Sequence, residues 1–192
     1  LAVLAADTPA SAAALFTTNL AQAAPVTISR QHLERTRGVA RAVVVNSGCA
    51  NACTGGRGMA DARRMASLTA RSLDCEPDQV LVLSTGVIGR HLDMEKLARG
   101  IAAGASPAAE RGGQAAARAI LTTDTRPKTA GADLRVGSRR FALRALAKGA
   151  GMIHPGLATM LAVVTTDAPL APDALRVALR SAVERSFNRV SV

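Results

Sequence analysis

Apolar residues recur along the chain in short runs that have the length of buried β-strands. The clearest runs are 40–45, 80–83 and 160–164, which are made largely of valine, leucine and alanine. Continuous apolar runs of this length, bounded by turn residues, are typical of strands that are covered on both faces. The three runs therefore predict the centre of a buried β-structure.

Two hairpins and one isolated strand are predicted from weaker patterns. Residues 134–136 and 140–143 alternate in polarity around a Gly-Ser turn, and residues 1–6 and 12–17 flank an Asp-Thr-Pro turn. Apolar segments separated by such turn residues favour antiparallel pairing. Residues 25–28 are predicted to form a short strand.

Helical spacing of apolar residues alternates with the predicted strands. Ser29 and Asp93 are placed to cap helices, because a short polar side chain can accept a hydrogen bond from the first turn. The predicted helices are 29–35, 59–73, 94–103, 108–121 and one that begins at Pro172. The last of these is predicted to turn its apolar residues toward the core: Leu175, Val177, Ala178, Leu179, Ala182 and Val183. This alternation indicates an α/β protein, a layered sandwich of helices and buried sheets.

The composition limits where the protein can act. Hydrophobic residues make up 48% of the 192 residues and aromatic residues only 2%, so the core must consist mainly of aliphatic side chains. No apolar run approaches the roughly 20 residues needed to cross a bilayer, and no signal-peptide pattern opens the chain. We expect a soluble, cytoplasmic protein without a membrane partner. Both ends interrupt apolar stretches, so we also expect the chain to be a fragment of a longer protein.

The charged and metal-binding residue types exclude two further classes. The net charge is +10, but the basic residues are scattered and the chain has no Trp or Tyr for base stacking, which argues against nucleic-acid binding. Cys49, Cys53 and Cys75 lack C-x-x-C spacing and have no nearby His pair, so no metal site and no disulfide framework are predicted. His32 and His91 are isolated and are predicted to be surface residues.

One segment, 148–167, combines a flexible loop with a buried strand. Gly149, Gly151, Pro155 and Gly156 lie in its first half, and the apolar run begins directly after Thr159. A threonine hydroxyl at such a junction can act as a nucleophile if its own amino group is free, because an α-amine has a pKa of about 7.7–8.0 and can accept the hydroxyl proton.

Thr159 has a free amine only if the bond between Ala158 and Thr159 is cut. The Thr159 hydroxyl could cut it by attacking the Ala158 carbonyl, and the resulting ester would then be hydrolysed. Pro155 and Gly156 would favour this step by holding an unusual turn. From spacing alone, a purely structural loop is the more common interpretation of such a segment.

Four motifs occur in order along most of the chain. They read VNSGCANACTG at 45–55, STGVIG at 84–89, ILTTDTRPK at 120–128, and GMIHPGLATML at 151–161 followed by TTDA. Together they resemble the ornithine acetyltransferase family, the bifunctional glutamate N-acetyltransferases of arginine biosynthesis. The resemblance implies a self-processing fold like that of the N-terminal-nucleophile enzymes.

The resemblance implies a cleavage site and an oxyanion hole. The chain would be cleaved between Ala158 and Thr159, and Thr159 would be the nucleophile. The Thr85 hydroxyl and the Gly86 N–H would stabilise the negative charge on the acetyl carbonyl. Without the resemblance, the Ser-Thr-Gly segment would be interpreted as a turn that ends a strand.

The resemblance also implies three substrate-binding residues: Thr122, Lys148 and Thr159. Thr123 is the near alternative to Thr122 in the alignment of the motif. The Lys148 ammonium would pair with the substrate carboxylate as a point charge. Taken alone, a lysine at the end of a strand is usually just solvated.

The implied activity is transfer of an acetyl group from N2-acetylornithine to glutamate through an acetyl-threonine intermediate. No cofactor is implied, and acetyl-CoA as a further acetyl donor stays open. The alternative is an N-terminal-nucleophile aminopeptidase or amidohydrolase of related mechanism. Residues 1–158 would belong to an alpha chain and residues 159–192 would begin a beta chain, and two of each would assemble as a heterotetramer.

Some positions depart from the usual family pattern. Gly156 and Cys49 stand where asparagine is common in the family, and Leu157 stands where methionine is common. If the asparagine that Gly156 replaces orients the scissile bond, self-cleavage is expected to be slower in this protein.

Overall fold

The first sheet of the protein has three strands. The computed structural model describes residues 1–106, 108–109, 112–156 and 160–192. The central strand, β2 (Val39–Cys49), pairs antiparallel with β1 (Ala2–Ser11) and parallel with β3 (Val80–Val87). Helix α2 (Gly55–Leu73) connects β2 to β3, as parallel neighbours require a crossover connection. The runs at 40–45 and 80–83 are thus strands, as predicted, and the structure shows that they are neighbours.

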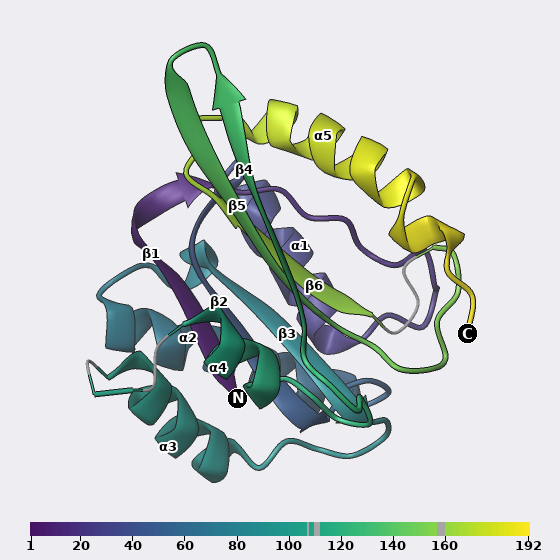
Figure 1. The fold of residues 1–192 in the computed structure, drawn as a ribbon. Coiled ribbons are helices and arrows are strands. Elements are labelled where there is room, and N and C mark those ends of the chain that lie inside the picture. The colour runs from purple at the N-terminus through teal and green to yellow at the C-terminus, as the bar shows by residue number, and fades with distance from the viewer. Residues whose placement is uncertain (107, 110–111, 157–159) are drawn as a thin grey trace.

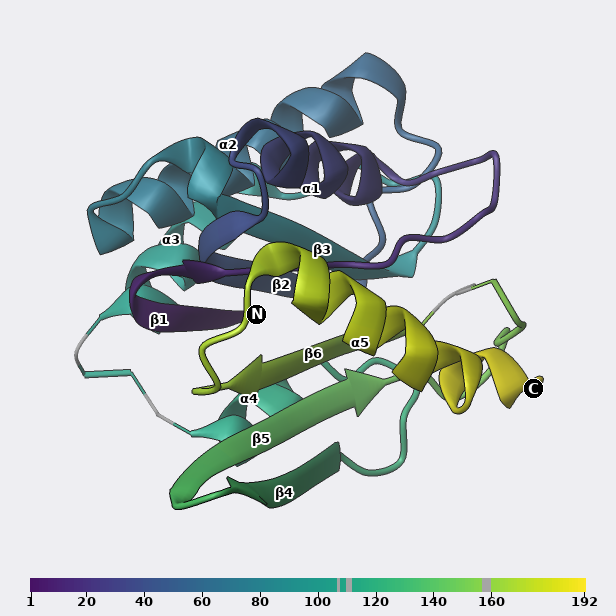
Figure 2. The ribbon, with the colours of Figure 1, turned by 90° about the horizontal axis from the view of Figure 1, so that it is seen from above.

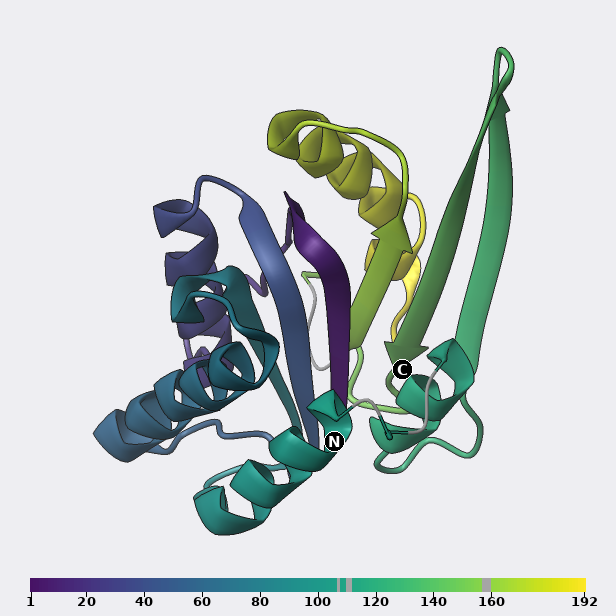
Figure 3. The ribbon, with the colours of Figure 1, turned by 90° about the vertical axis from the view of Figure 1, so that its left-hand side faces the viewer.

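Helices cover one face of this sheet (Figures 1 and 3). Helices α1 (Ala24–Arg35) and α2 pack against it, and α3 (Met94–Ala105) lies alongside α2 and β1. The apolar stripes of the helices meet the sheet in one core. Its fully buried members include Ile28, Val44, Met65, Val82 and Ile101.

A second three-stranded sheet lies on the other side of the first (Figures 2 and 3). Its strands β4 (Lys128–Val136), β5 (Arg139–Lys148) and β6 (Leu161–Thr166) are antiparallel, with β5 in the middle. The predicted hairpin at 134–143 is thus confirmed.

The two sheets share a smaller apolar core. Ala2 and Val45 of the first sheet and Leu146 of the second belong to it, and Leu161 and Val163 pack against it. Helix α4 (Gly113–Ala119) and the residue after it contribute the buried side chains Ala117 and Ile120. The order of layers is helices, first sheet, second sheet, so the predicted α/β layered sandwich is confirmed.

Helix α5 (Pro172–Glu184) follows β6 and begins at the predicted proline. Leu175 and Leu179 are half-buried and Val183 is buried, at a spacing of four residues. Val177 is 71% exposed, and Ala178 and Ala182 are also exposed. The prediction that these three residues face the core is wrong, because the apolar stripe of α5 is narrower than its composition indicates.

The predicted hairpin at 1–17 is wrong. Strand β1 continues to Ser11, through the Asp-Thr-Pro segment, and its register against β2 shifts between Ala5 and Ala10. Strand β1 pairs with β2 on both sides of this irregularity, so the Asp-Thr-Pro residues stay within the strand and do not form a hairpin turn. Residues 12–17 form neither a helix nor a strand.

The predicted strand at 25–28 is also wrong, because helix α1 begins at Ala24. Pro25 occupies its first turn, where the missing N–H costs nothing. Ser29 is therefore inside the helix and is not its cap. Its buried hydroxyl donates to the Val82 carbonyl oxygen at 2.8 Å and so ties α1 to β3.

Other boundaries differ more modestly. Helix α2 begins at Gly55, before the predicted start at residue 59. Helix α4 is shorter than the predicted helix at 108–121. The segment near the C-terminus contains a short 3-10 helix, η2 (Phe187–Arg189).

Ile28→Ala is expected to destabilise the protein by about 2–5 kcal/mol, because its side chain is fully buried between α1 and the sheet. Urea unfolding measures the change. The matched control is Ile88→Ala, whose side chain is 52% exposed, with an expected loss below about 1 kcal/mol. Equal losses for the two variants would contradict the placement of the core.

Candidate active site

The ends of β2 and β3 place several polar residues side by side. In the parallel register, Asn46 pairs with Ser84 and Ser47 pairs with Thr85. The Ser84 hydroxyl donates to the Asn46 side-chain oxygen, and the Asn46 amide donates to the Cys49 carbonyl oxygen at 2.8 Å. These bonds fix the strand ends on either side of Thr85, which is itself buried.

A glycine at position 86 lets the same strand ends approach closely. Gly86 has φ +132° and Gly48 has φ +104°, and a Cβ on Gly86 would lie 2.2 Å from the Gly48 carbonyl carbon. Only a residue without a side chain fits this contact. The Ser-Thr-Gly segment is thus part of β3, which continues to Val87, and the interpretation of it as a strand-ending turn is wrong.

Lys148 connects this region to the second sheet. It is the last residue of β5 and is only 4% exposed. Its ammonium donates to the Thr85 hydroxyl oxygen at 2.9 Å and to the Thr122 hydroxyl oxygen at 2.6 Å. The structure therefore brings together three of the residues singled out in the sequence. The interpretation of Lys148 as a solvated strand end is wrong.

Asp124 completes the cluster, and the sequence interpretation missed it. Its Oδ1 accepts hydrogen bonds from the Lys128 ammonium at 2.5 Å and from the Gly149 N–H at 2.8 Å. Its Oδ2 lies 3.7 Å from the Lys148 ammonium, and its side chain is fully buried. An acidic residue four positions before Lys128, in a polar turn, is the signal that could have identified it.

The charges in the cluster suit a bound anion. Two ammonium groups, from Lys128 and Lys148, face one carboxylate, from Asp124. The hydroxyls of Thr85 and Thr122 lie against the Lys148 ammonium. An excess of positive charge beside hydroxyl groups can stabilise a carboxylate or a developing oxyanion.

The loop that leads to the junction is held by contacts from distant segments. The Thr18 N–H donates to the Gly156 carbonyl oxygen at 3.2 Å, and the Gly156 N–H donates to the Asn188 side chain at 3.2 Å. Ile153 exchanges two backbone hydrogen bonds with Val192. Ala158 and Thr159, the predicted cleavage site and nucleophile, lie outside the described residues.

Histidine and cysteine side chains do not gather into a site. Within the described ranges, no group of three or more His, Cys, Asp or Glu residues is placed to hold a metal ion. His91 is exposed, as predicted. His32 is buried, with Nδ1 2.8 Å from the Val80 carbonyl oxygen and Nε2 3.4 Å from Asp78, so its prediction as a surface residue is wrong.

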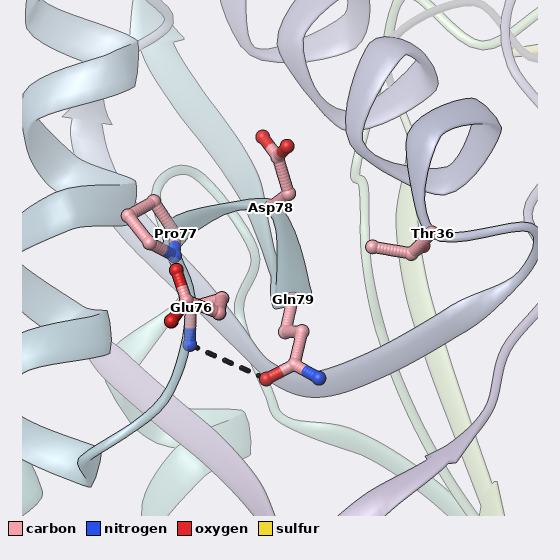
Figure 4. A pocket seen from close by; sticks show the side chains of 5 residues that line it. All are labelled: Thr36, Glu76, Pro77, Asp78 and Gln79. Carbon is pink, nitrogen blue, oxygen red and sulfur yellow. Dashed lines mark hydrogen bonds between the residues drawn. The ribbon is translucent and has the colours of Figure 1, made fainter.

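A surface hollow lies at the other end of β3, before its first residue (Figure 4). It is lined by Thr36 and by Glu76 to Gln79, and the Glu76 N–H donates to the Gln79 side chain. Asp78, which lines it, already pairs with Arg35 at 3.2 Å. Because Thr85 lies near the opposite end of the strand, this hollow is separate from the Lys148 cluster.

Gly86→Ala is expected to destabilise the protein by more than about 2 kcal/mol, because it adds a backbone clash to the strain of a positive φ. The control is Gly89→Ala, where φ is also positive but no atom lies within 4 Å of the added Cβ, so that only the strain of about 1–2 kcal/mol remains. Thermal and urea unfolding of both variants separate the two effects. A smaller loss for Gly86→Ala than for Gly89→Ala would disprove the close contact.

Asp124→Asn is expected to make the free energy of unfolding less dependent on pH under acidic conditions. Burial alone would raise the pKa of the Asp124 carboxyl, but the hydrogen bonds from Lys128 and Gly149, together with the charges of Lys128 and Lys148, hold this pKa below its ordinary value. The carboxylate therefore contributes stability above the unfolded-state pKa and loses it as the pH falls through the lower folded-state pKa.

The free energy of unfolding of the wild type should thus approach that of Asp124→Asn as the pH falls below about 4. Urea unfolding at a series of pH values measures this, with Asp133→Asn, an exposed carboxylate on β4, as the control. A gap between wild type and Asp124→Asn that does not change with pH would contradict the lowered pKa.

No helix in the described ranges combines the length and apolar character needed to span a bilayer.

Comparison with known proteins gives a consistent result along the whole chain. The arginine biosynthesis bifunctional protein ArgJ of Symbiobacterium thermophilum is 51% identical over 192 residues, which are 100% of this chain and 47% of that protein. The chain thus spans about half the length of the curated relatives it matches.

Two solved structures share the fold. The crystal structure of the arginine biosynthesis bifunctional protein ArgJ from Bacillus halodurans has a TM-score of 0.74 and 36% identity, covering 83% of this chain and 81% of that chain. The ornithine acetyltransferase of Mycobacterium tuberculosis, crystallised in complex with ornithine, has a TM-score of 0.59 and 34% identity, covering 85% and 77%. The ArgJ family itself matches residues 1–192. With this match over every residue, the chain belongs to the ArgJ family.

Proposed function

We propose that the protein of which this chain is a part transfers an acetyl group from N2-acetylornithine to glutamate in arginine biosynthesis. Membership of the ArgJ family supports the class of activity, and the names of the relatives contain arginine biosynthesis and ornithine acetyltransferase. The observation that carries the proposal is the buried Lys148 ammonium between the Thr85 and Thr122 hydroxyls. This arrangement suits an amino-acid carboxylate or an acyl oxyanion.

The first step of the proposal is self-cleavage. The Thr159 hydroxyl attacks the Ala158 carbonyl, the peptide bond becomes an ester, and water hydrolyses the ester. The products are an Ala158 carboxylate and a free amine on Thr159, dividing the chain into 1–158 and the segment that starts at residue 159. The free amine then serves as the base that a threonine nucleophile needs.

Chain connectivity supports a place for Thr159 at the Lys148 cluster. Leu161, two residues after Thr159, pairs with Lys148 in the register of β5 and β6. Two residues of extended chain span at most about 7 Å. This connectivity supports the proposed role of Thr159 at the Lys148 cluster.

The transfer itself has two halves. The Thr159 oxygen attacks the acetyl carbonyl and its amine takes the hydroxyl proton, while the Thr85 hydroxyl and the Gly86 N–H stabilise the oxyanion. Ornithine leaves with the proton returned by the same amine. The amine of glutamate then attacks acetyl-Thr159 by the reverse route, and the hydroxyl of Thr159 is restored.

Substrate binding is assigned to Thr122, Lys148 and Thr159. The Lys148 ammonium pairs with the carboxylate that both amino-acid substrates share, which lets one site accept ornithine and glutamate in turn. Acetyl-CoA as a second donor is left open. We further propose a heterotetramer of two alpha and two beta chains and a cytoplasmic location.

Thr159→Ala in the full-length protein is expected to abolish both self-cleavage and acetyl transfer, because it removes the hydroxyl that performs both steps. Intact-mass measurement reports cleavage, and mass spectrometry of the residue-159 peptide reports one added acetyl group with N2-acetylornithine and its loss with glutamate. The matched control is Thr165→Ala on β6, where the side chain is exposed.

Continued cleavage and acetyl exchange in Thr159→Ala would overturn the proposal. Release of amino acids from short peptides, without any acetyl acceptor, would instead favour the aminopeptidase alternative.

A further inference from the structure

We infer that Asp124 is a positioning residue that holds the Lys148 ammonium against Thr85 and thereby directs the Thr85 hydroxyl proton toward the reacting carbonyl. The inference deepens the proposed function and rests on it, because it concerns the same oxyanion hole. It assigns to Asp124 a role that is exerted through the Lys148 ammonium.

The Asp124 carboxylate holds both the side chain and the backbone of the lysine position. It accepts a hydrogen bond from the N–H of Gly149, the residue directly after Lys148, at 2.8 Å. Its second oxygen lies 3.7 Å from the Lys148 ammonium. The end of β5 is therefore fixed from two directions by one buried group.

The direction of the hydrogen bonds decides what the threonine hydroxyls can do. An ammonium group only donates, so Lys148 must occupy a lone pair on the oxygens of Thr85 and Thr122. The hydroxyl proton of each threonine then points elsewhere. Among the described residues, neither hydroxyl donates a hydrogen bond, so both protons are available to a bound anion.

The charge of Lys148 depends on Asp124 for its partner. The Lys148 side chain is 5% exposed, and burying an ammonium without an opposite charge is costly. The Oδ2 atom of Asp124 receives no hydrogen bond from the described residues, so no other donor competes there with the Lys148 ammonium 3.7 Å away. Lys128 is the other charged group on this carboxylate, bound to Oδ1.

Asp124→Asn keeps the size of the side chain but removes this arrangement. An amide has one oxygen, so if it accepts from Lys128 and Gly149 it must point its NH₂ group at the Lys148 ammonium. Two donors then face each other, and the ammonium is pushed from its place beside Thr85. A misplaced group of this kind lowers kcat by about 10- to 100-fold.

A double-mutant cycle in the full-length protein tests the inference. The variants are Asp124→Asn, Thr85→Ala and the two combined, with Asp133→Asn as the surface control and circular dichroism as the check on folding. If Asp124 acts through Thr85, Asp124→Asn lowers kcat for acetyl transfer about 10- to 100-fold in the wild type but less than about threefold once Thr85 is alanine. A purely structural residue would lower kcat equally in both backgrounds, and that result would overturn the inference.

Reductive methylation of lysines gives a readout that does not need activity. Lys148 should react faster in Asp124→Asn than in the wild type, with the partly exposed Lys96 as the reference peptide in the same sample. Unchanged labelling of Lys148 would overturn the inference. Absence of acetyl transfer by the wild type would refute the proposed function, and the labelling result would still decide whether Asp124 holds the ammonium.

Discussion

A buried ammonium group joins the two sheets at the candidate site. Lys148 ends β5 of the second sheet and donates to Thr85 of the first sheet, 63 residues earlier in the chain. A buried charge is tolerated only when it is paired and hydrogen-bonded, so Thr85, Thr122 and Asp124 must all reach it. One atom, the Nζ of Lys148, therefore lies where the two sheets, the end of α4 and the polar turn after α4 meet.

The rest of the site depends on the close approach between the backbones of β2 and β3. Gly86 has no side chain and so lets the end of β3 lie against the backbone of Gly48 in β2, which places Thr85 at the edge that faces Lys148. The bond between Ser84 and Asn46 then holds the two strands on the other side of Thr85. A charged group from one sheet and a glycine contact within the other thus define the same small region, where a carboxylate or an oxyanion is stabilised.

Local sequence patterns predicted the secondary structure correctly where a segment had a long periodic pattern and no long-range contact opposed it. The helix at 59–73, the strand at 40–45 and the hairpin around Gly137 belong to this group. They failed where a distant partner decided the outcome. Pairing with β2 keeps the turn-like Asp-Thr-Pro residues inside strand β1. Ser29, which the sequence predicted to be a helix cap, lies inside α1 and is bonded to Val82. In both cases a long-range contact outweighs a local preference of about 1 kcal/mol.

The sequence by itself determined the family, through four ordered motifs, and the α/β class, through apolar runs that alternate with helical stripes. It also named Thr85, Gly86 and Thr122, which lie inside these motifs, and Lys148, which lies shortly before the last of them. Only the tertiary structure decided that three of these side chains meet and that Asp124 faces the ammonium. Spacing along a chain carries no information on which sheet faces cover each other, and that facing is set by apolar burial between segments far apart in sequence.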